Sequence, residues 1–203
     1  PMQQFNLPNP QAIPLSQVKA GVNYAIVITT NTGLWRYMPG DTVMFTSLQP
    51  YRIIVTGRTK HYINMVGEEV MVHNTDEALS KTCRELNCTV TDYSIGPIPL
   101  TTSNCGAHEW VVEFETAPFN LSQFEQLLDK HLRQLNSDYD AKRNGNIALG
   151  NLVVRNVGNG TFYKWLSLKN KLGGQHKVPR LSNSRTIIEE LLATDLVHID
   201  KQV

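Results

Sequence analysis

The sequence lacks several features that would assign it to a class of protein. No apolar run approaches the roughly 20 residues that a helix needs to cross a bilayer. Its 19 basic and 18 acidic residues nearly cancel, so neither sign of charge is in excess to attract nucleic acid or an anionic membrane. The chain does not start with the charged and apolar segments of a secretory signal. We therefore expect a cytoplasmic protein without a nucleic-acid or membrane partner.

Cysteine is scarce and follows no pattern. Cys83, Cys88 and Cys105 are an odd count in a chain that is long enough to bury a core without disulfides, which favours a reducing compartment. Zinc sites have ligand pairs at tighter, repeated spacing, and the six histidines contain no HExxH pattern. We predict no metal ligands in this chain.

Glycine-rich loops that grip nucleotide phosphates are missing too, because the pattern GxxxxGK[ST] does not occur. The chain starts at Pro1 with an extended segment that holds Pro8, Pro10 and Pro14, which is unusual for the start of an independent domain. We therefore expect a carboxy-terminal piece of a longer protein, which holds only part of the functional site.

Residues 1–58 have the pattern of a small β subdomain. Residues 24–30 are rich in β-branched side chains and predict a strand, and the turn at 31–33 returns the chain as 34–37. Two further strands are expected at 42–46 and 52–56. Four short strands without a helix predict a small antiparallel barrel or curled sheet.

Residues 59–203 alternate between helical and strand patterns, which predicts an α+β domain with one small mixed sheet flanked by helices. Asn74 with Glu77 resembles a capping box, and Asn120 with Gln123 marks a second helix start. Strands are expected at 90–95, 109–115 and 152–156, helices after Asn74 and Asn120 and at 161–172 and 184–192, and a polar connection at 137–145.

Three charged residues stand where they could carry chemistry. Asp41 follows Pro39-Gly40, and its carboxylate could accept hydrogen bonds from two neighbouring hydroxyls or be an ordinary turn aspartate. Arg58 follows an apolar run and could clamp a phosphate or lie exposed in a turn. Lys177 follows Gly173-Gly174, which favours a flexible loop that presents an ammonium, with a solvent-exposed basic loop as the alternative.

The order and spacing of residues 33–41, 57–69 and 173–180 resemble motifs of the acyl-acid amido synthetases of the auxin-responsive promoter (Gretchen Hagen three) family, within the adenylate-forming enzymes. The resemblance covers most of residues 10–190 and favours a bacterial-type member. Two departures are Trp35, where the family has tyrosine, and His176, where it has an aromatic residue.

The resemblance implies a role for each matching residue. Tyr37 and Asp41 lie in the ribose-binding motif, in which the aspartate holds both ribose hydroxyls. Arg58 lies near the ribose or phosphate, and Lys60 is the pivot about which a mobile carboxy-terminal domain rotates.

The same resemblance makes the turn at Gly67 and Glu68 a loop that swings towards the active site on the acceptor side. There Glu68 or Glu69 binds an amine acceptor or only solvates a loop, and the sequence does not separate the two. Lys177 would be the catalytic lysine, which stabilises negative charge during adenylation.

The implied activity is ATP-dependent. A carboxylic acid attacks the α-phosphate to give acyl-AMP and pyrophosphate, and an amino acid then displaces AMP to form an amide. Mg²⁺ would bridge the phosphates, held with ATP mostly by the missing amino-terminal part, so this fragment alone is expected to be inactive. Two alternatives stay open: a ligase with a thiol acceptor such as coenzyme A, and a nucleotide-binding or interaction module whose site has decayed. The acid, the amine and the oligomeric state are not indicated.

Overall fold

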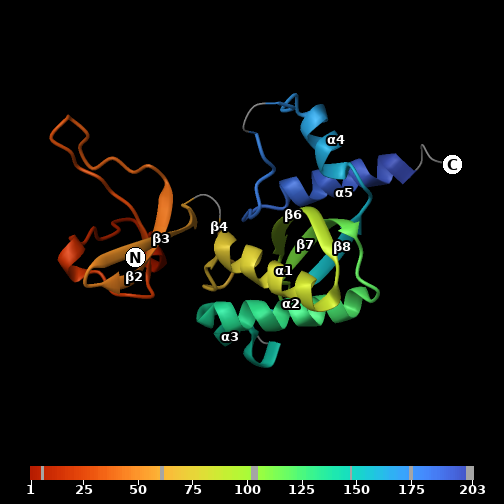
Figure 1. The fold of residues 1–203 in the computed structure, drawn as a ribbon, viewed down its shortest axis with the longest axis horizontal. Helices are drawn as coiled ribbons and strands as arrows, with labels where there is room; N and C mark the ends of the chain where they lie inside the picture. The colour runs from red at the N-terminus through yellow and green to blue at the C-terminus, as the bar shows by residue number, and fades with distance from the viewer. Residues whose placement is uncertain (6, 60–61, 102–104, 147, 174–175, 200–203) are drawn as a thin grey trace.

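The computed structural model describes residues 1–5, 7–59, 62–101, 105–146, 148–173 and 176–199. Figure 1 shows two parts side by side, a small β sheet near the amino terminus and a larger part in which helices cover a second sheet. Within the described residues, no helix is long and apolar enough to cross a membrane.

The first part is a three-stranded antiparallel sheet in the order β1-β2-β3, formed by Asn23–Ala25, Asp41–Leu48 and Tyr51–Arg58. The predicted strands at 42–46 and 52–56 are confirmed and are longer than expected. The predicted strand at 24–30 leaves the sheet after Ala25. It then forms a hairpin in which Ile28 and Tyr37 exchange two backbone hydrogen bonds of 2.7 and 2.8 Å. The four-stranded expectation is therefore wrong, because the outer half of that strand pairs only with its own return.

The core of this first part is small. Tyr24, Val43 and Phe45 are buried together, with the rings of Tyr24 and Phe45 edge to face at a centroid distance of 6.0 Å. Short 3-10 helices at Met2–Gln4 and Leu15–Gln17 precede the sheet. Several apolar side chains of β3 and of the hairpin stay exposed, among them Ile53, Val55 and Trp35, which is 78% exposed.

The second part begins with a two-stranded antiparallel sheet, β4 (Tyr62–Ile63) and β5 (Val70–Met71). It continues with a three-stranded mixed sheet: β6 (Thr89–Ile98) pairs antiparallel with β7 (Ala107–Thr116), and β7 pairs parallel with β8 (Val153–Val157). The predicted strands of this sheet are confirmed within a few residues at each end.

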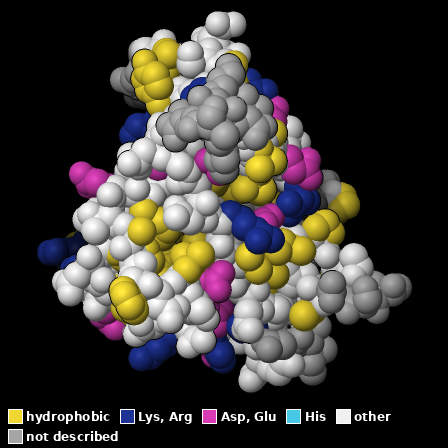
Figure 2. All heavy atoms as spheres, turned by 90° about the vertical axis from the view of Figure 1, so that its right-hand side faces the viewer, with side chains coloured by type: hydrophobic (Ala, Val, Ile, Leu, Met, Phe, Trp, Pro, Cys, Tyr) yellow, Lys and Arg dark blue, Asp and Glu magenta, His cyan; other side chains and the backbone are white. Residues whose placement is uncertain are grey.

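Helices cover both faces of the mixed sheet, and side chains of the central strand β7 pack against the helices on each face. The side chains of Trp110 and Val112 lie in the cluster that contains α1 (Val72–Leu86) and α2 (Leu121–Leu135). Val111 points to the other face, where α4 (Thr161–Leu168) and α5 (Thr186–Ile199) pack (Figure 1). The α+β prediction with a small mixed sheet between helices is confirmed. On the face shown in Figure 2, basic and acidic side chains lie among apolar ones.

Helix ends test the capping predictions. The Asn120 side chain accepts a hydrogen bond from the Gln123 amide at 3.1 Å, so the predicted start of α2 is confirmed. The predicted start at Asn74 is wrong, because α1 begins at Val72 and Asn74 lies inside its first turn. There the Asn74 amide oxygen accepts a hydrogen bond from the Met71 amide at 3.1 Å. Asparagine can close a helix start from either position, which the sequence pattern does not distinguish.

Three other boundaries differ from the predictions. The polar connection at 137–145 contains a helix, α3 (Ser137–Arg143), because Asn136 caps it and the Tyr139 ring is fully buried. Helix α4 ends at Leu168, before the left-handed backbone of Asn170. Helix α5 runs to Ile199 because Leu191 and Thr194 continue its buried face. The division of the chain at residues 58 and 59 stays a prediction.

Candidate functional site

Asp41 and Arg58 meet at the open end of the first sheet. Asp41 begins β2 and Arg58 ends β3, and the two residues are direct cross-strand partners. The Arg58 guanidinium donates a hydrogen bond from Nε to Asp41 Oδ1 at 3.1 Å, and the side chains are 62% and 39% exposed. Gly40 precedes them with a φ of +89°, a backbone conformation that glycine adopts without strain. A carboxylate and a guanidinium are thus held side by side at an accessible strand end.

The hairpin that leads into Asp41 carries exposed aromatic side chains. Tyr37 and Trp35 both face solvent, and Arg36 between them has a left-handed backbone with a φ of +49°. The backbone of Tyr37, four residues before Asp41 in the sequence, is hydrogen-bonded to Ile28, which fixes this part of the hairpin. The hairpin therefore presents aromatic rings to solvent on the segment that leads into Asp41.

The turn at 64–67 is stabilised by two side chains whose oxygens accept hydrogen bonds from its backbone N–H groups. Met65 and Val66 each donate a backbone hydrogen bond to one carboxylate oxygen of Glu68, both at 2.8 Å. Gly67 donates to the Asn64 side-chain oxygen at 2.7 Å, and its φ of +98° requires glycine. Gly67 is exposed and Glu68 is 0% exposed. Neither of the two roles considered for the Gly67-Glu68-Glu69 turn accounts for the buried position of Glu68, which holds the turn from inside.

Electrostatics separate the two neighbouring glutamates. Burial alone would raise the pKa of the Glu68 carboxyl, but hydrogen bonds from His108, Val66 and Met65 outweigh it, so this pKa lies below its ordinary value. The pKa of Glu69 is raised, first by burial and then by the nearby Asp138 carboxylate. Glu68 therefore stays an ionised acceptor for the turn's N–H groups.

This lowered pKa predicts how the turn responds to acid. A carboxylate with a lowered folded-state pKa stabilises the fold above its unfolded pKa, and the contribution is lost as the pH falls through the folded pKa. We expect the Met65 and Val66 amides to keep their hydrogen-exchange protection at about pH 5 and to lose it only at a pH below the 4.5 of an ordinary glutamate.

Protection factors measured against pH test this expectation. The Tyr139 amide is the control, because it donates to the neutral Asn136 side chain at 2.7 Å. Loss of protection at Met65 and Val66 above pH 4.5, with Tyr139 unchanged, would contradict the lowered pKa.

Lys177 is exposed on the segment between α4 and α5. Among the described residues, no hydrogen bond or ion pair to its ammonium is formed. The chain just after Lys177 is fastened to the edge of β6. Ser94 donates to the Pro179 carbonyl and the Ile95 amide donates to the Arg180 carbonyl, both at 2.8 Å.

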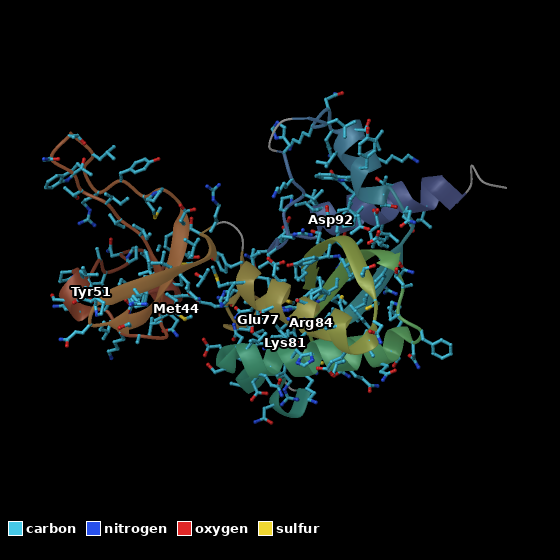
Figure 3. The ribbon with its side chains drawn as sticks, viewed as in Figure 1. Met44, Tyr51, Glu77, Lys81, Arg84 and Asp92 are labelled. Atoms are coloured by element: carbon cyan, nitrogen blue, oxygen red, sulfur yellow. The ribbon has the colours of Figure 1, made fainter. Side chains whose placement is uncertain are left out.

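The Arg180 guanidinium adds a second anchor. It stacks over the Tyr93 ring at 4.4 Å and donates a hydrogen bond to Asp92, which Figure 3 labels on β6. Arg180 is therefore structural, and Lys177 lies just before the anchored residues with its side chain exposed.

The structure brings some predicted residues together and leaves others apart. Asn183, which follows the Lys177 segment, accepts a hydrogen bond from the Asn64 amide at 2.8 Å and donates to the Tyr62 carbonyl at 2.9 Å. The Gly67 turn and the Lys177 segment are thus joined through Asn183 within the second part of the chain. Asp41 and Arg58 lie in the first sheet, at the ends of β2 and β3 (Figure 1). Lys60, the predicted pivot, lies outside the described residues.

A row of buried polar residues behind the turn was not predicted. His108 on β7 is 1% exposed and contacts Glu68 at 2.9 Å, and its ring lies 5.4 Å from that of Tyr139. The Tyr139 hydroxyl donates to Asp129 at 2.7 Å, and Asp129 also pairs with the buried Arg143 at 2.8 Å. Glu68 and His108 are 40 residues apart in the sequence, so the available signal for their contact was a polar side chain next to the apolar pattern of β7.

The described residues contain no group of three or more histidine, cysteine, aspartate or glutamate side chains that could hold a metal ion. The Asp41 carboxylate has the chemistry to accept hydrogen bonds from hydroxyl groups, and the Arg58 guanidinium has the chemistry to bind an anion.

Comparison with known families gives matches over both parts of the chain. Residues 73–186 match the model of the GH3 family C-terminal domain, and residues 1–58 match the model of the GH3 family central domain. The first match alone covers more than half of the chain.

Two curated relatives from Arabidopsis thaliana are similar over most of the chain. Indole-3-acetic acid-amido synthetase GH3.10 is 29% identical over 192 residues, and indole-3-acetic acid-amido synthetase GH3.3 is 27% identical over 194 residues. The alignments cover 88% and 89% of this chain but only 31% and 32% of the relatives. The chain therefore spans about a third of the length of the curated relatives it matches.

Solved structures share the fold. The structure of GH3.15 acyl acid amido synthetase has a TM-score of 0.67 at 21% sequence identity, over 91% of this chain and 35% of that chain. The structure of AtGH3.15 acyl acid amido synthetase in complex with 2,4-DB has a TM-score of 0.65 at the same identity and coverage.

Proposed function

Because the chain belongs to the GH3 family, we propose that it is the carboxy-terminal part of an ATP-dependent acyl-acid amido synthetase. The enzyme adenylates a carboxylic acid and transfers the acyl group to an amino acid. The geometric observation that carries the proposal is the pair of Asp41 and Arg58, held at an accessible strand end that follows the exposed aromatic hairpin in the chain. The two GH3 family matches and the amido synthetase relatives support the same activity.

The first half-reaction makes acyl-AMP. A carboxylate oxygen of the acid attacks the α-phosphorus of ATP, the bond from that phosphorus to the bridging oxygen breaks, and pyrophosphate leaves. We assign the ribose hydroxyls to the Asp41 carboxylate and the neighbouring phosphate or ribose to Arg58, with Tyr37 beside the nucleoside. Lys177 supplies positive charge where negative charge develops on the α-phosphate and the leaving group. Mg²⁺ would neutralise the phosphates, and we assign it to residues outside this chain.

The second half-reaction makes the amide. The amine nitrogen attacks the acyl carbonyl, AMP leaves with the electrons of the broken carbon–oxygen bond, and the nitrogen loses a proton. We assign the acceptor side to the exposed turn at Gly67. Because the Gly67 turn and the Lys177 segment are joined through Asn183, one rotation about Lys60 would withdraw Lys177 and bring in the turn.

The test uses the full-length protein that contains this chain. AMP release from ATP and Mg²⁺ is measured with pooled carboxylic acids, with and without pooled amino acids. We expect AMP release to require both pools. Release that requires a thiol such as coenzyme A in place of the amino acids would contradict the amido synthetase, and absence of both AMP release and ATP binding would indicate a decayed site.

Asp41→Asn tests the ribose assignment in the same assay. A hydrogen bond to a charged group contributes about 1.5–3 kcal/mol, so we expect the KM for ATP to rise about 10- to 100-fold. Asp138→Asn, a change of an aspartate on α3 in the other part, is the matched control. An unchanged KM for ATP in Asp41→Asn would contradict the assignment.

A further inference from the structure

The turn at 64–67 is held by one buried carboxylate. Glu68 Oε1 accepts two hydrogen bonds, from the Met65 amide at 2.8 Å and from His108 Nε2 at 2.9 Å. Glu68 Oε2 accepts the third, from the Val66 amide at 2.8 Å. Since the turn's own N–H groups point inward to this carboxylate, the position of Glu68 decides the shape of the turn.

His108 in turn decides where Glu68 lies. Its ring nitrogen Nε2 faces an ionised carboxylate, so Nε2 carries the proton and donates it. Within the described part of the chain, the buried Nδ1 has no hydrogen-bond partner. The ring is therefore oriented by Glu68 on one side and by packing against Tyr139, 5.4 Å away, on the other. The unpaired buried Nδ1 is costly, whereas an apolar side chain at this position would leave the buried Glu68 carboxylate without its donor from β7.

We propose that Glu68 and His108 are positioning residues for acyl transfer, which hold the exposed turn at Gly67 in the shape that receives the amine acceptor. This inference rests on the proposed function. Both side chains are buried, so neither touches the substrate in this conformation. They act through the backbone of residues 65–67, because rigid support of a reacting loop is needed to keep its geometry within a fraction of an ångström.

The chain offers a matched comparison for this pair. Glu113 lies on β7 and, like Glu68, is a buried glutamate. Its two oxygens accept backbone hydrogen bonds from Gly160 at 2.8 Å and Phe162 at 3.1 Å. It caps the start of α4, on the opposite face of the sheet from α1 and α2. Glu113→Gln and Glu68→Gln each replace a buried carboxylate that accepts two backbone hydrogen bonds, one at the start of α4 and the other in the turn at 64–67.

The experiment measures the two half-reactions of the full-length protein separately. Adenylation is followed by acid-dependent exchange of pyrophosphate into ATP, and transfer by single-turnover discharge of preformed acyl-AMP with the amine. In Glu68→Gln the new amide group would face a backbone N–H with its own N–H₂, which breaks one of the three hydrogen bonds. We expect transfer to slow about 10²-fold, as for a small misplacement of a reacting group, and exchange to change by less than about 3-fold.

His108 is tested by conservative rescue. In His108→Gln the side-chain amide can still donate to Glu68, whereas in His108→Phe this donor is lost. We expect His108→Phe to slow transfer like Glu68→Gln, and His108→Gln to recover most of the rate. Glu113→Gln is expected to lower the thermal midpoint without changing the ratio of the two half-reaction rates.

The possible outcomes separate this inference from the proposed function. Equal losses in both half-reactions for Glu68→Gln, or a transfer rate within about 3-fold of the wild type, would overturn the positioning role while the function stands. Equal rates for His108→Gln and His108→Phe would overturn it too. Absence of acid-dependent exchange in the wild-type protein would overturn the proposed function, and the positioning role with it.

Discussion

Replacing Lys177 with alanine is expected to slow adenylation about 10²–10³-fold and to leave acyl transfer nearly unchanged, because removal of a preorganised charge costs this much where charge develops. The structure places Lys177 exposed on an anchored segment, where its charge is available to a phosphate. Transfer starts from acyl-AMP, after pyrophosphate has left, and needs no such charge in the proposed scheme. Pyrophosphate exchange and single-turnover transfer measure the two steps.

Lys171→Ala is the control for this result. Lys171 is also exposed on the connection between α4 and α5, six residues before Lys177, and the proposed mechanism gives it no role. We expect both half-reactions of Lys171→Ala to stay near those of the wild type. Equal losses in adenylation and transfer for Lys177→Ala would argue for a general structural defect and against the assigned role.

Asp129→Ala is expected to lower the free energy of unfolding by about 3–5 kcal/mol, the range for removing one partner of a buried ion pair. The Arg143 guanidinium is 3% exposed and donates to both oxygens of Asp129, at 2.8 and 2.9 Å. The buried Tyr139 hydroxyl donates to the same carboxylate at 2.7 Å. Removal of Asp129 takes the counter-charge and an acceptor from two buried groups at once. Chemical denaturation of the 203-residue chain measures the loss.

Asp140→Ala provides the matched surface comparison. Asp140 pairs with Arg133 at 2.5 Å, but both side chains are more than a third exposed, so we expect a loss of about 0–1 kcal/mol. If the two variants lost similar stability, the buried pair would not be the support of α2 and α3 that the contacts indicate.

Local signals predicted the secondary structure well where they coincided with burial. The strands β6 and β7 were predicted from the strand patterns of residues 90–95 and 109–115, and the start of α2 from the cap at Asn120, and the tertiary packing agrees with them. Helix α3 was missed because its only strong packing residue is Tyr139, and Arg143 is buried only through its pairing with Asp129 on α2. A seven-residue polar segment carries too little periodicity to reveal such a partner.

Site residues show the same division. Asp41, Arg58 and Lys177 were found as separate stretches, each of which also fitted an ordinary turn. Only the register of β2 and β3 places the first two as direct partners at 3.1 Å. Glu68 and His108 are 40 residues apart, and a lone histidine in a strand pattern does not indicate a glutamate elsewhere.

The sequence by itself determined the two kinds of secondary structure, the α+β class and the three stretches that carry the charged residues, because these depend on local composition and spacing. The tertiary structure decided which of those charges meet, which glutamate of the 68–69 pair is buried, and that Asn183 links the segment after Lys177 to the Gly67 turn. These outcomes depend on strand register and on contacts between residues far apart in the chain, which no local pattern contains.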